Sequence, residues 1–239
     1  MTHYLLIHGS WHGGWCWHKI APRLRAEGHS VAVPDLAGRA RDRRSKLRIS
    51  LGHMAAQIAR SLPKDRKTIV VVHSRYGVLA SALAQLAPDR IERTIYLAAY
   101  MLPTGARAAD YFRADRGSLL RPYVSVNKLA LCDSLSPEIY REGLYHDCSA
   151  DDVALAHSLL CPEPVRPAMA KLRLSDDRYG RVPRAYIRLS EDRAVTPALQ
   201  DRCLNETSVE RVEELRASHS AYFSMPDQLV QAIQTLAKA

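Results

Sequence analysis

Three residue types that together perform nucleophilic catalysis occur in this chain, far apart in the sequence. Ser74 lies within VVHSRYGV (71–78), the acids Glu191 and Asp192 follow YIRLS (186–190), and His219 lies within ASHSAYFS (217–224). A serine hydroxyl is a poor nucleophile until a base takes its proton, and that base is usually a histidine oriented by a carboxylate. The sequence therefore offers a nucleophile, an acid and a base in the order Ser, Asp, His.

Each of these residues also has a simpler structural role open to it. Ser74 precedes a run of helix formers and could serve as a helix N-cap. His219 could be an ordinary loop histidine, and Asp192 could cap the helix that follows it. Glu191 is the competing acid beside Asp192. The sequence alone leaves these alternatives open.

The surrounding elements indicate how distant residues could meet. Short segments rich in β-branched residues alternate with helical patterns, which is typical of a mostly parallel sheet with helices on both faces. We expect strands at 3–8, 29–33, 68–73, 93–97, 184–189 and 209–215, and helices at 15–27, 51–62, 77–86 and 226–237. The segment TIVVVH (68–73) is apolar throughout, so it predicts a central strand buried on both faces. The three candidate residues each follow a predicted strand and should meet at one edge of the sheet.

Residues 104–179 interrupt this alternation. The segment has helical character, little strand character, and several prolines and aromatic residues. We interpret it as a helical lid inserted into a single α/β domain that spans residues 1–239. A lid at this position would cover the carboxyl ends of the strands, where open α/β folds bind ligands.

Composition narrows the class of protein. The chain has 239 residues, 47% of them hydrophobic, which suits one α/β domain. No stretch reaches the roughly 20 apolar residues of a membrane span, and MTHYLLIHGS lacks the features of a signal peptide, so we expect a cytoplasmic protein without a membrane partner. Five scattered cysteines without a CxxC pair predict reduced thiols, and neither a metal nor another cofactor is expected.

The charge is positive, with a formal value of +9 and its densest run at RARDRRSKLR (39–48). The run contains no aromatic residue, belongs to no recognisable nucleic-acid-binding module and is broken by Asp42. We therefore interpret it as a solvated loop and expect a small-molecule substrate with no nucleic-acid partner.

Several motifs together are similar to the α/β-hydrolase superfamily, within the branch of plant methylesterases, hydroxynitrile lyases and related bacterial esterases. They are HGSWHGGWCWHKI (8–20), PDLAGR (34–39), HSRYG (73–77), IYLAAYMLPTG (95–105), VPRAYIRLSEDRAVTP (182–197) and ASHSAYFSMPDQL (217–229). The resemblance runs over nearly all of the chain. It implies an α/β-hydrolase fold, and it allows a homodimer, although no stretch specifies an interface.

The resemblance assigns a role to each candidate residue. It implies Ser74 as nucleophile, His219 as general base and then acid, and Asp192 as the orienting carboxylate. The backbone N–H groups of Ser10 and Arg75 would form the oxyanion hole, in a loop shaped by His8 and Gly9. A metal pair formed by His8 and His12 is disfavoured by Gly9 and the loop around it. For substrate binding we single out Trp11, Tyr76 and Tyr100, and Trp11 could equally be a packing residue.

The turn that carries Ser74 departs from the family pattern G-x-S-x-G, in which small residues flank the serine at two positions. Val72 and Tyr76 occupy those positions here, and Gly77 comes one place later. Either neighbouring segments make room for the turn, or the turn relaxes and moves the Ser74 hydroxyl away from His219. Tyr76 would push adjoining segments apart or direct its phenol into the pocket.

The function predicted first is hydrolysis of a small apolar or aromatic carboxylic ester through an acyl-enzyme. One alternative is a non-hydrolytic lyase, decarboxylase or cyclase on the same fold. Hydroxynitrile lyases of one type place a lysine after the histidine, where this chain has Ser220, which disfavours cyanohydrin cleavage. The other alternative is a ligand-binding protein with a nonfunctional nucleophile turn.

Overall fold

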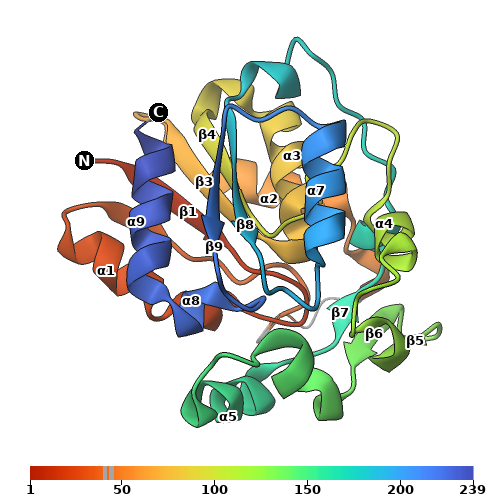
Figure 1. The fold of residues 1–239 in the computed structure, drawn as a ribbon. Helices are drawn as coiled ribbons and strands as arrows, with labels where there is room; N and C mark the ends of the chain where they lie inside the picture. Colours follow the sequence, from red (N-terminus) through yellow and green to blue (C-terminus); the bar gives the residue numbers. More distant parts are fainter. Residues whose placement is uncertain (40–41, 43–45, 239) are drawn as a thin grey trace.

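The main sheet of the computed structural model has six strands, all paired in parallel, in the order β2-β1-β3-β4-β8-β9. The strands are β1 (His3–Ile7), β2 (Ser30–Ala32), β3 (Thr68–His73), β4 (Ile91–Leu97), β8 (Arg184–Leu189) and β9 (Arg211–Leu215). The structure describes residues 1–39, 42 and 46–238. The predicted parallel α/β architecture is thereby confirmed (Figure 1).

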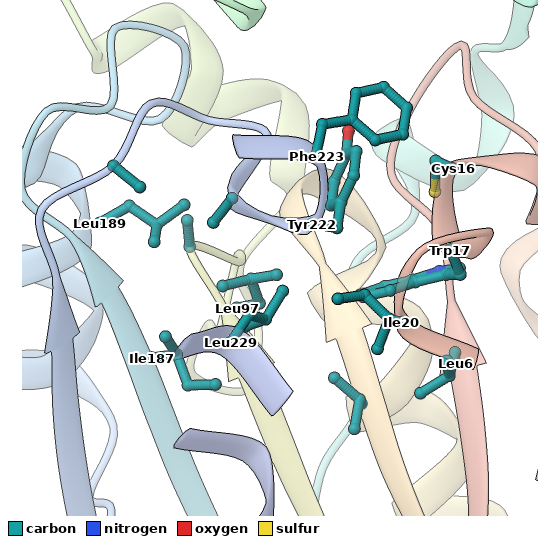
Figure 2. Packing of buried hydrophobic residues seen from close by; sticks show 14 of the residues in the cluster. Leu6, Cys16, Trp17, Ile20, Leu97, Ile187, Leu189, Tyr222, Phe223 and Leu229 are labelled. Atoms are coloured by element: carbon teal, nitrogen blue, oxygen red, sulfur yellow. The ribbon is translucent and has the colours of Figure 1, made fainter. Parts of the chain in front are cut away.

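Helices cover both faces of this sheet and divide the core into two clusters. On one face, α1 (Ile20–Ala26) and α9 (Pro226–Ala237) pack against Ile69 and Val71 of β3. On the other, α2 (Leu51–Ser61), α3 (Gly77–Leu86) and α7 (Pro197–Glu206) contribute to the core cluster that contains Val70 and Val72. Successive strand residues point to opposite faces, so the uninterrupted apolar run of β3 supplies both clusters. Figure 2 shows residues of the first cluster, among them Trp17, Ile20 and Leu229, lying against one face of the sheet.

The helix expected over residues 15–27 is wrong in its extent. A 3-10 turn, Gly14–Trp17, comes first, and α1 begins only at Ile20. Pro22 explains the later start, because proline lacks an N–H group and is tolerated only in the first turn of a helix. A continuous helix from Trp15 would have placed Pro22 in its interior.

The segment between β4 and β8 contains more strand than expected. It holds α4 (Ala108–Ala114), β5 (Val124–Asn127), β6 (Cys132–Leu135), α5 (Ala150–Leu159), β7 (Glu163–Pro164) and α6 (Arg166–Met169). The strands form a small antiparallel sheet in the order β5-β6-β7. Strands of two to four residues are too short to give a periodic signal, which is why the sequence pattern missed them. The part from α4 to α6 is hereafter called the lid, and in Figure 1 its helix α5 and strands β5, β6 and β7 gather at the end of the main sheet away from both termini.

The sequence also predicted that no segment spans a membrane and that the cysteines are reduced thiols. Within the described residues, no helix is long and apolar enough to cross a membrane. All five cysteines are free thiols, and four of them are buried.

Candidate active site

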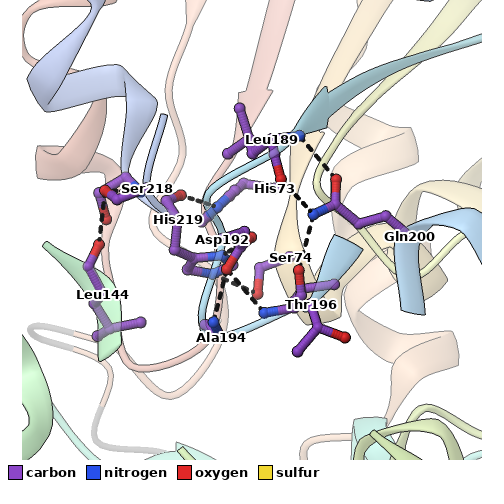
Figure 3. Close-up of polar contacts among 12 residues, drawn as sticks. His73, Ser74, Leu144, Leu189, Asp192, Ala194, Thr196, Gln200, Ser218 and His219 are labelled. Carbon is purple, nitrogen blue, oxygen red and sulfur yellow. Dashed lines mark hydrogen bonds and ion pairs between the residues drawn. The ribbon is translucent and has the colours of Figure 1, made fainter. Parts of the chain in front are cut away.

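Ser74, His219 and Asp192 form a hydrogen-bonded chain at the carboxyl ends of three strands. The Ser74 hydroxyl donates to His219 Nε2 at 3.0 Å, and His219 Nδ1 donates to Asp192 Oδ2 at 2.6 Å (Figure 3). The three residues follow β3, β9 and β8, and each is less than a tenth exposed. With Nδ1 donating to the carboxylate, the imidazole leaves Nε2 free to accept the serine proton.

The Asp192 carboxylate is fixed by the turn in which it lies. Its Oδ1 accepts hydrogen bonds from the backbone N–H groups of Ala194 (2.7 Å) and Val195 (2.9 Å), so Oδ2 faces the imidazole. Thr196, not Asp192, caps α7 through its side chain. Glu191 instead pairs with Arg216 at 2.6 Å. The alternative roles considered for Asp192 and for Glu191 are therefore wrong.

The loop that carries His219 is held from both sides. The Ser218 N–H donates to Asp147 Oδ2 at 2.8 Å, and His73 Nε2 donates to the carbonyl oxygen of His219 at 2.9 Å. Burial, followed by the electrostatic effect of the neighbouring His219, lowers the pKa of His73 well below its usual value. His73 is thus a neutral group that fixes the His219 backbone without adding charge beside the imidazole.

The turn at Ser74 is formed despite its unusual neighbours. Ser74 has a φ of 60°, in the left-handed region that non-glycine residues rarely occupy. No side-chain capping bond is present at the 3-10 turn Ser74–Tyr76, so the alternative that Ser74 is an N-cap is wrong. The Tyr100 N–H donates to the Ser74 carbonyl at 3.0 Å, which ties the turn to the chain following β4.

Gly77, rather than a glycine two places from Ser74, allows a close approach of two backbones. A Cβ atom at this position would lie 2.5 Å from the Tyr100 carbonyl oxygen and 2.7 Å from its nitrogen. On the other side, Val72 is an ordinary fully buried strand residue in register with Ile7 and Tyr96. Of the two outcomes left open by the sequence, the structure has the one in which neighbouring segments make room.

Tyr76 neither separates these segments nor enters a pocket. Its side chain is fully buried and its phenol donates a hydrogen bond to Glu163 of β7, which also accepts one from Arg39. Burial alone would raise the pKa of Glu163, but the Arg39 charge and hydrogen bond outweigh it and lower that pKa to about 2. The expectation of a solvated loop over 39–48 is wrong for Arg39, which is only 2% exposed; residues 40–41 and 43–45 lie outside the described residues.

The loop after β1 contains a second residue in the left-handed region, Trp11, with a φ of 60°. His12 Nδ1 donates to the Ser10 carbonyl at 2.6 Å, while His12 Nε2 contacts the hydroxyls of Tyr145 at 2.6 Å and of Tyr222 at 3.0 Å. Burial lowers the pKa of His12 to about 3, so this imidazole is neutral and serves as a hydrogen-bonded brace.

Both ring nitrogens of His8 also have partners within the protein. Its Nδ1 contacts the Gly9 carbonyl at 2.8 Å, and its Nε2 accepts the Leu36 N–H at 3.1 Å. Across the part of the chain that the structure describes, no group of three or more His, Cys, Asp or Glu side chains could hold a metal ion.

A cavity of about 430 Å³ lies beside the residue that follows Ser74. Apolar side chains of the lid form most of its wall, among them Phe112, Val124 and Ala168. The charged residues that line it are Arg75, Arg113, Lys128 and Asp133. The three residues singled out from the sequence for substrate binding, Trp11, Tyr76 and Tyr100, do not line this cavity. Trp11 packs beneath the Arg75 guanidinium instead, 5.2 Å from it.

Sequence reasoning missed the three charged residues Arg39, Asp133 and Glu163. Each is almost fully buried, and each forms an ion pair with a residue far away in the chain. An isolated acid in an irregular segment carries no periodic signal, so nothing in the pattern distinguished Asp133 or Glu163 from a surface residue.

This combination of a parallel sheet, a lid and a Ser-His-Asp chain is that of an α/β-hydrolase, and residues 4–232 match the model of the alpha/beta hydrolase family. The chain belongs to that family. It is 31% identical to methylesterase 1 of Arabidopsis thaliana, with 95% of this chain and 92% of that protein covered.

A second relative and a solved structure indicate the branch of the family to which the chain is similar. The chain is 31% identical to a protein of Arabidopsis thaliana named as methylesterase 11, chloroplastic, and spans 99% of itself but only 64% of that longer protein. The crystal structure of a pyrethroid hydrolase from Sphingobium faniae JZ-2 superposes with a TM-score of 0.89 at 26% identity, covering 100% of this chain and 98% of that one. The methylesterase-like branch inferred from the motifs is confirmed, and ester hydrolysis is the activity that these relatives support.

Proposed function

We propose that this protein is a serine hydrolase that cleaves carboxylic esters through an acyl-enzyme, with Ser74, His219 and Asp192 as its catalytic triad. The observation that carries the proposal is the continuous hydrogen-bonded chain from Asp192 through His219 to the Ser74 hydroxyl. Its members stand at the strand ends in the order that α/β-hydrolases use. The methylesterase relatives support the same reaction class.

In the first half-reaction, Ser74 Oγ attacks the ester carbonyl carbon while His219 Nε2 takes the hydroxyl proton. The oxygen that becomes negative would accept hydrogen bonds from the N–H groups of Ser10 and Arg75. The tetrahedral intermediate collapses as its bond to the alcohol oxygen breaks, and His219 returns the proton to that oxygen. Asp192 keeps the imidazolium oriented and stabilises its charge.

In the second half-reaction, a water molecule loses a proton to His219 Nε2 and attacks the acyl carbon. The Ser74 oxygen leaves with that proton, which releases a carboxylic acid and restores the resting enzyme. Neither half-reaction requires a metal or an organic cofactor.

The cavity beside Arg75 supports a small apolar or aromatic ester as substrate. Its volume of about 430 Å³ is within the range of small-molecule sites, and its wall is mainly aliphatic with one aromatic ring, Phe112. Arg75 lines the cavity and directly follows Ser74. We propose that one of the two groups joined by the ester bond occupies this cavity while the carbonyl lies at Ser74.

The test combines covalent labelling with turnover. We expect wild-type protein to react with a fluorophosphonate probe at Ser74 and to hydrolyse p-nitrophenyl and methyl aryl esters. Ser74→Ala should abolish labelling and lower kcat by at least about 10⁴-fold. The matched control is Ser81→Ala, another buried serine, on α3, whose hydroxyl contacts Gly77 and Tyr96 and not His219. Substantial turnover by Ser74→Ala would refute the proposal and would indicate chemistry without an acyl-enzyme.

A further inference from the structure

Two carboxylates of the lid face the candidate active site side by side. Asp133 of β6 and Glu163 of β7 are directly opposite each other in the small antiparallel sheet, and they are 5% and 0% exposed. Like charges at opposite positions of a strand pair are destabilising. Partners of opposite charge or with hydrogen-bond donors must therefore compensate the pair, and those partners show what the pair does.

Both carboxylates bind the loop after β1 at the same residue, Trp11. The Trp11 indole N–H donates to Asp133 Oδ1 at 2.8 Å, and the Trp11 backbone N–H donates to Glu163 Oε2 at 2.8 Å. The N–H of Cys161, two residues before Glu163, donates to the Trp11 carbonyl at 2.9 Å. The lid thus holds the indole and both backbone polar groups of Trp11.

Both carboxylates also bind the turn after β3. Arg75 forms an ion pair with Asp133, with Nη1 donating to Oδ2 at 2.8 Å, and the Tyr76 phenol donates to Glu163. Arg75 is 8% exposed and Tyr76 is fully buried. Each lid carboxylate therefore joins the nucleophile turn to the loop after β1.

The two segments joined in this way carry the strained residues of the site. Trp11 and Ser74 both have a φ of 60°, an unfavourable conformation for a residue other than glycine that persists only where neighbours hold it. The two N–H groups that would form the oxyanion hole belong to Ser10 and Arg75, the immediate neighbours of these strained residues. Their directions depend on backbone torsions that the lid contacts stabilise.

We propose that Asp133 and Glu163 are positioning residues that keep the two oxyanion-hole donors aimed at one point. The inference rests on the proposed hydrolase function. This role accounts for the presence of two negative charges, Asp133 and Glu163, opposite each other in an almost fully buried place. It also accounts for the hydrogen bonds that Tyr76 and Arg39 donate to Glu163.

Neutral amides at these positions should impair this positioning. Glu163 accepts hydrogen bonds from Trp11, Tyr76 and Arg39, whereas a glutamine has one acceptor oxygen and presents N–H groups of its own. The same reasoning applies to Asp133→Asn, because Asp133 accepts from Trp11 and Arg75 through both oxygens.

The experiment compares Glu163→Gln and Asp133→Asn with wild type on p-nitrophenyl acetate, and measures binding of an aryl trifluoromethyl ketone. This ketone adds the serine oxygen to its carbonyl carbon and so presents an oxyanion to the hole. We expect kcat to fall by roughly 10- to 100-fold, since misplacement by about 1 Å can cost 10²-fold, while KM stays within about threefold. Affinity for the ketone should fall by the same factor as kcat/KM.

The matched control is Asp152→Asn. Asp152 is also a buried lid carboxylate with a cation partner, Lys19 at 2.7 Å, but it contacts neither Trp11 nor the nucleophile turn. We expect this variant to lose stability without a change in kcat or in ketone affinity.

Several outcomes separate this inference from the proposed function. Normal kcat and ketone affinity in folded Glu163→Gln and Asp133→Asn would overturn the inference and leave the hydrolase intact. If Glu163→Gln fails to fold, Tyr76→Phe, which removes only one hydroxyl from the network, should still lower kcat and ketone affinity in parallel, and unchanged values would overturn the role of Glu163. Wild-type protein that neither reacts with a fluorophosphonate nor hydrolyses any ester would refute the proposed function, and the inference with it.

Discussion

Replacing Tyr76 with glycine would restore a small residue at one of the flanking positions of the family turn, and the structure predicts that this change damages the protein. Tyr76 is completely buried beneath the lid and its phenol binds the Glu163 carboxylate. In Tyr76→Gly the aromatic ring leaves a cavity, and one of the hydrogen bonds that compensate a buried negative charge is lost.

The expected cost follows from these two losses. Removing a buried aromatic side chain typically costs about 3–5 kcal/mol, and a hydrogen bond to a charged group contributes about 1.5–3 kcal/mol. Glu163 keeps its contacts with Arg39 and Trp11, so the lost hydrogen bond should count at the lower end. We expect a loss of at least about 4 kcal/mol in the free energy of unfolding, against about 2 kcal/mol for Tyr76→Phe.

Equilibrium unfolding in urea measures this difference, with tryptophan fluorescence as the signal. A typical domain is stable by 5–15 kcal/mol, so Tyr76→Gly should lose a large fraction of its stability. Esterase activity per folded molecule, determined in parallel, should fall rather than rise. Tyr76→Phe is the matched control because it keeps the ring and removes only the hydroxyl.

A Tyr76→Gly variant as stable as wild type, or several-fold more active, would refute this reasoning. Such a result would mean that tyrosine obstructs the turn and that the Glu163 contact contributes nothing. The double variant with Val72→Gly extends the test, because Val72 lies in the central strand and glycine there weakens strand structure as well.

Three further results are expected. Gly77→Ala should lower both stability and activity by displacing the turn, because its Cβ would lie 2.5 Å from the Tyr100 carbonyl oxygen; unfolding midpoints and kcat unchanged from wild type would contradict this. Asp192→Asn should lower kcat by about 10⁴-fold, whereas Glu191→Gln should change it less than twofold, and steady-state kinetics that reverse this order would be inconsistent with the observed pairing. Because the pKa of Glu163 is lowered from 4.5 to about 2 in the folded state, its ionisation stabilises the fold above pH 4.5, and this contribution, on the order of 3 kcal/mol, is lost as the pH falls toward 2. Urea midpoints measured from pH 5 downward should therefore fall more steeply for wild type than for Glu163→Gln, and parallel curves would show that this carboxylate has an ordinary pKa.

The sequence was sufficient for the main sheet and for the order of the chemistry. The run TIVVVH predicts a strand buried on both faces, and β3 is the strand whose alternate residues supply the two core clusters. Parallel strands place their carboxyl ends at one edge, so residues after β3, β8 and β9 had to lie near one another. Periodicity is a local property that reports burial directly, which is why these predictions did not need the tertiary structure.

Other features were decided only by packing between distant segments. By residue type and by position after the strand alone, Glu191 and Asp192 are equivalent. The turn at Ala194 and Val195 determines that Asp192 faces His219. The unusual turn forms because Gly77 has no Cβ atom and so lets the turn approach the backbone of Tyr100, which follows β4.

The partners of the buried charged residues were likewise decided only by packing between distant segments. Glu163 lies 152 residues from Trp11 and 124 from Arg39, and no pattern within the short lid strands indicates which partners their side chains will reach. A local sequence pattern specifies the direction of a side chain relative to its own strand or helix. The partner that an isolated carboxylate finds depends on how the lid lies over the sheet, which is a property of the whole fold.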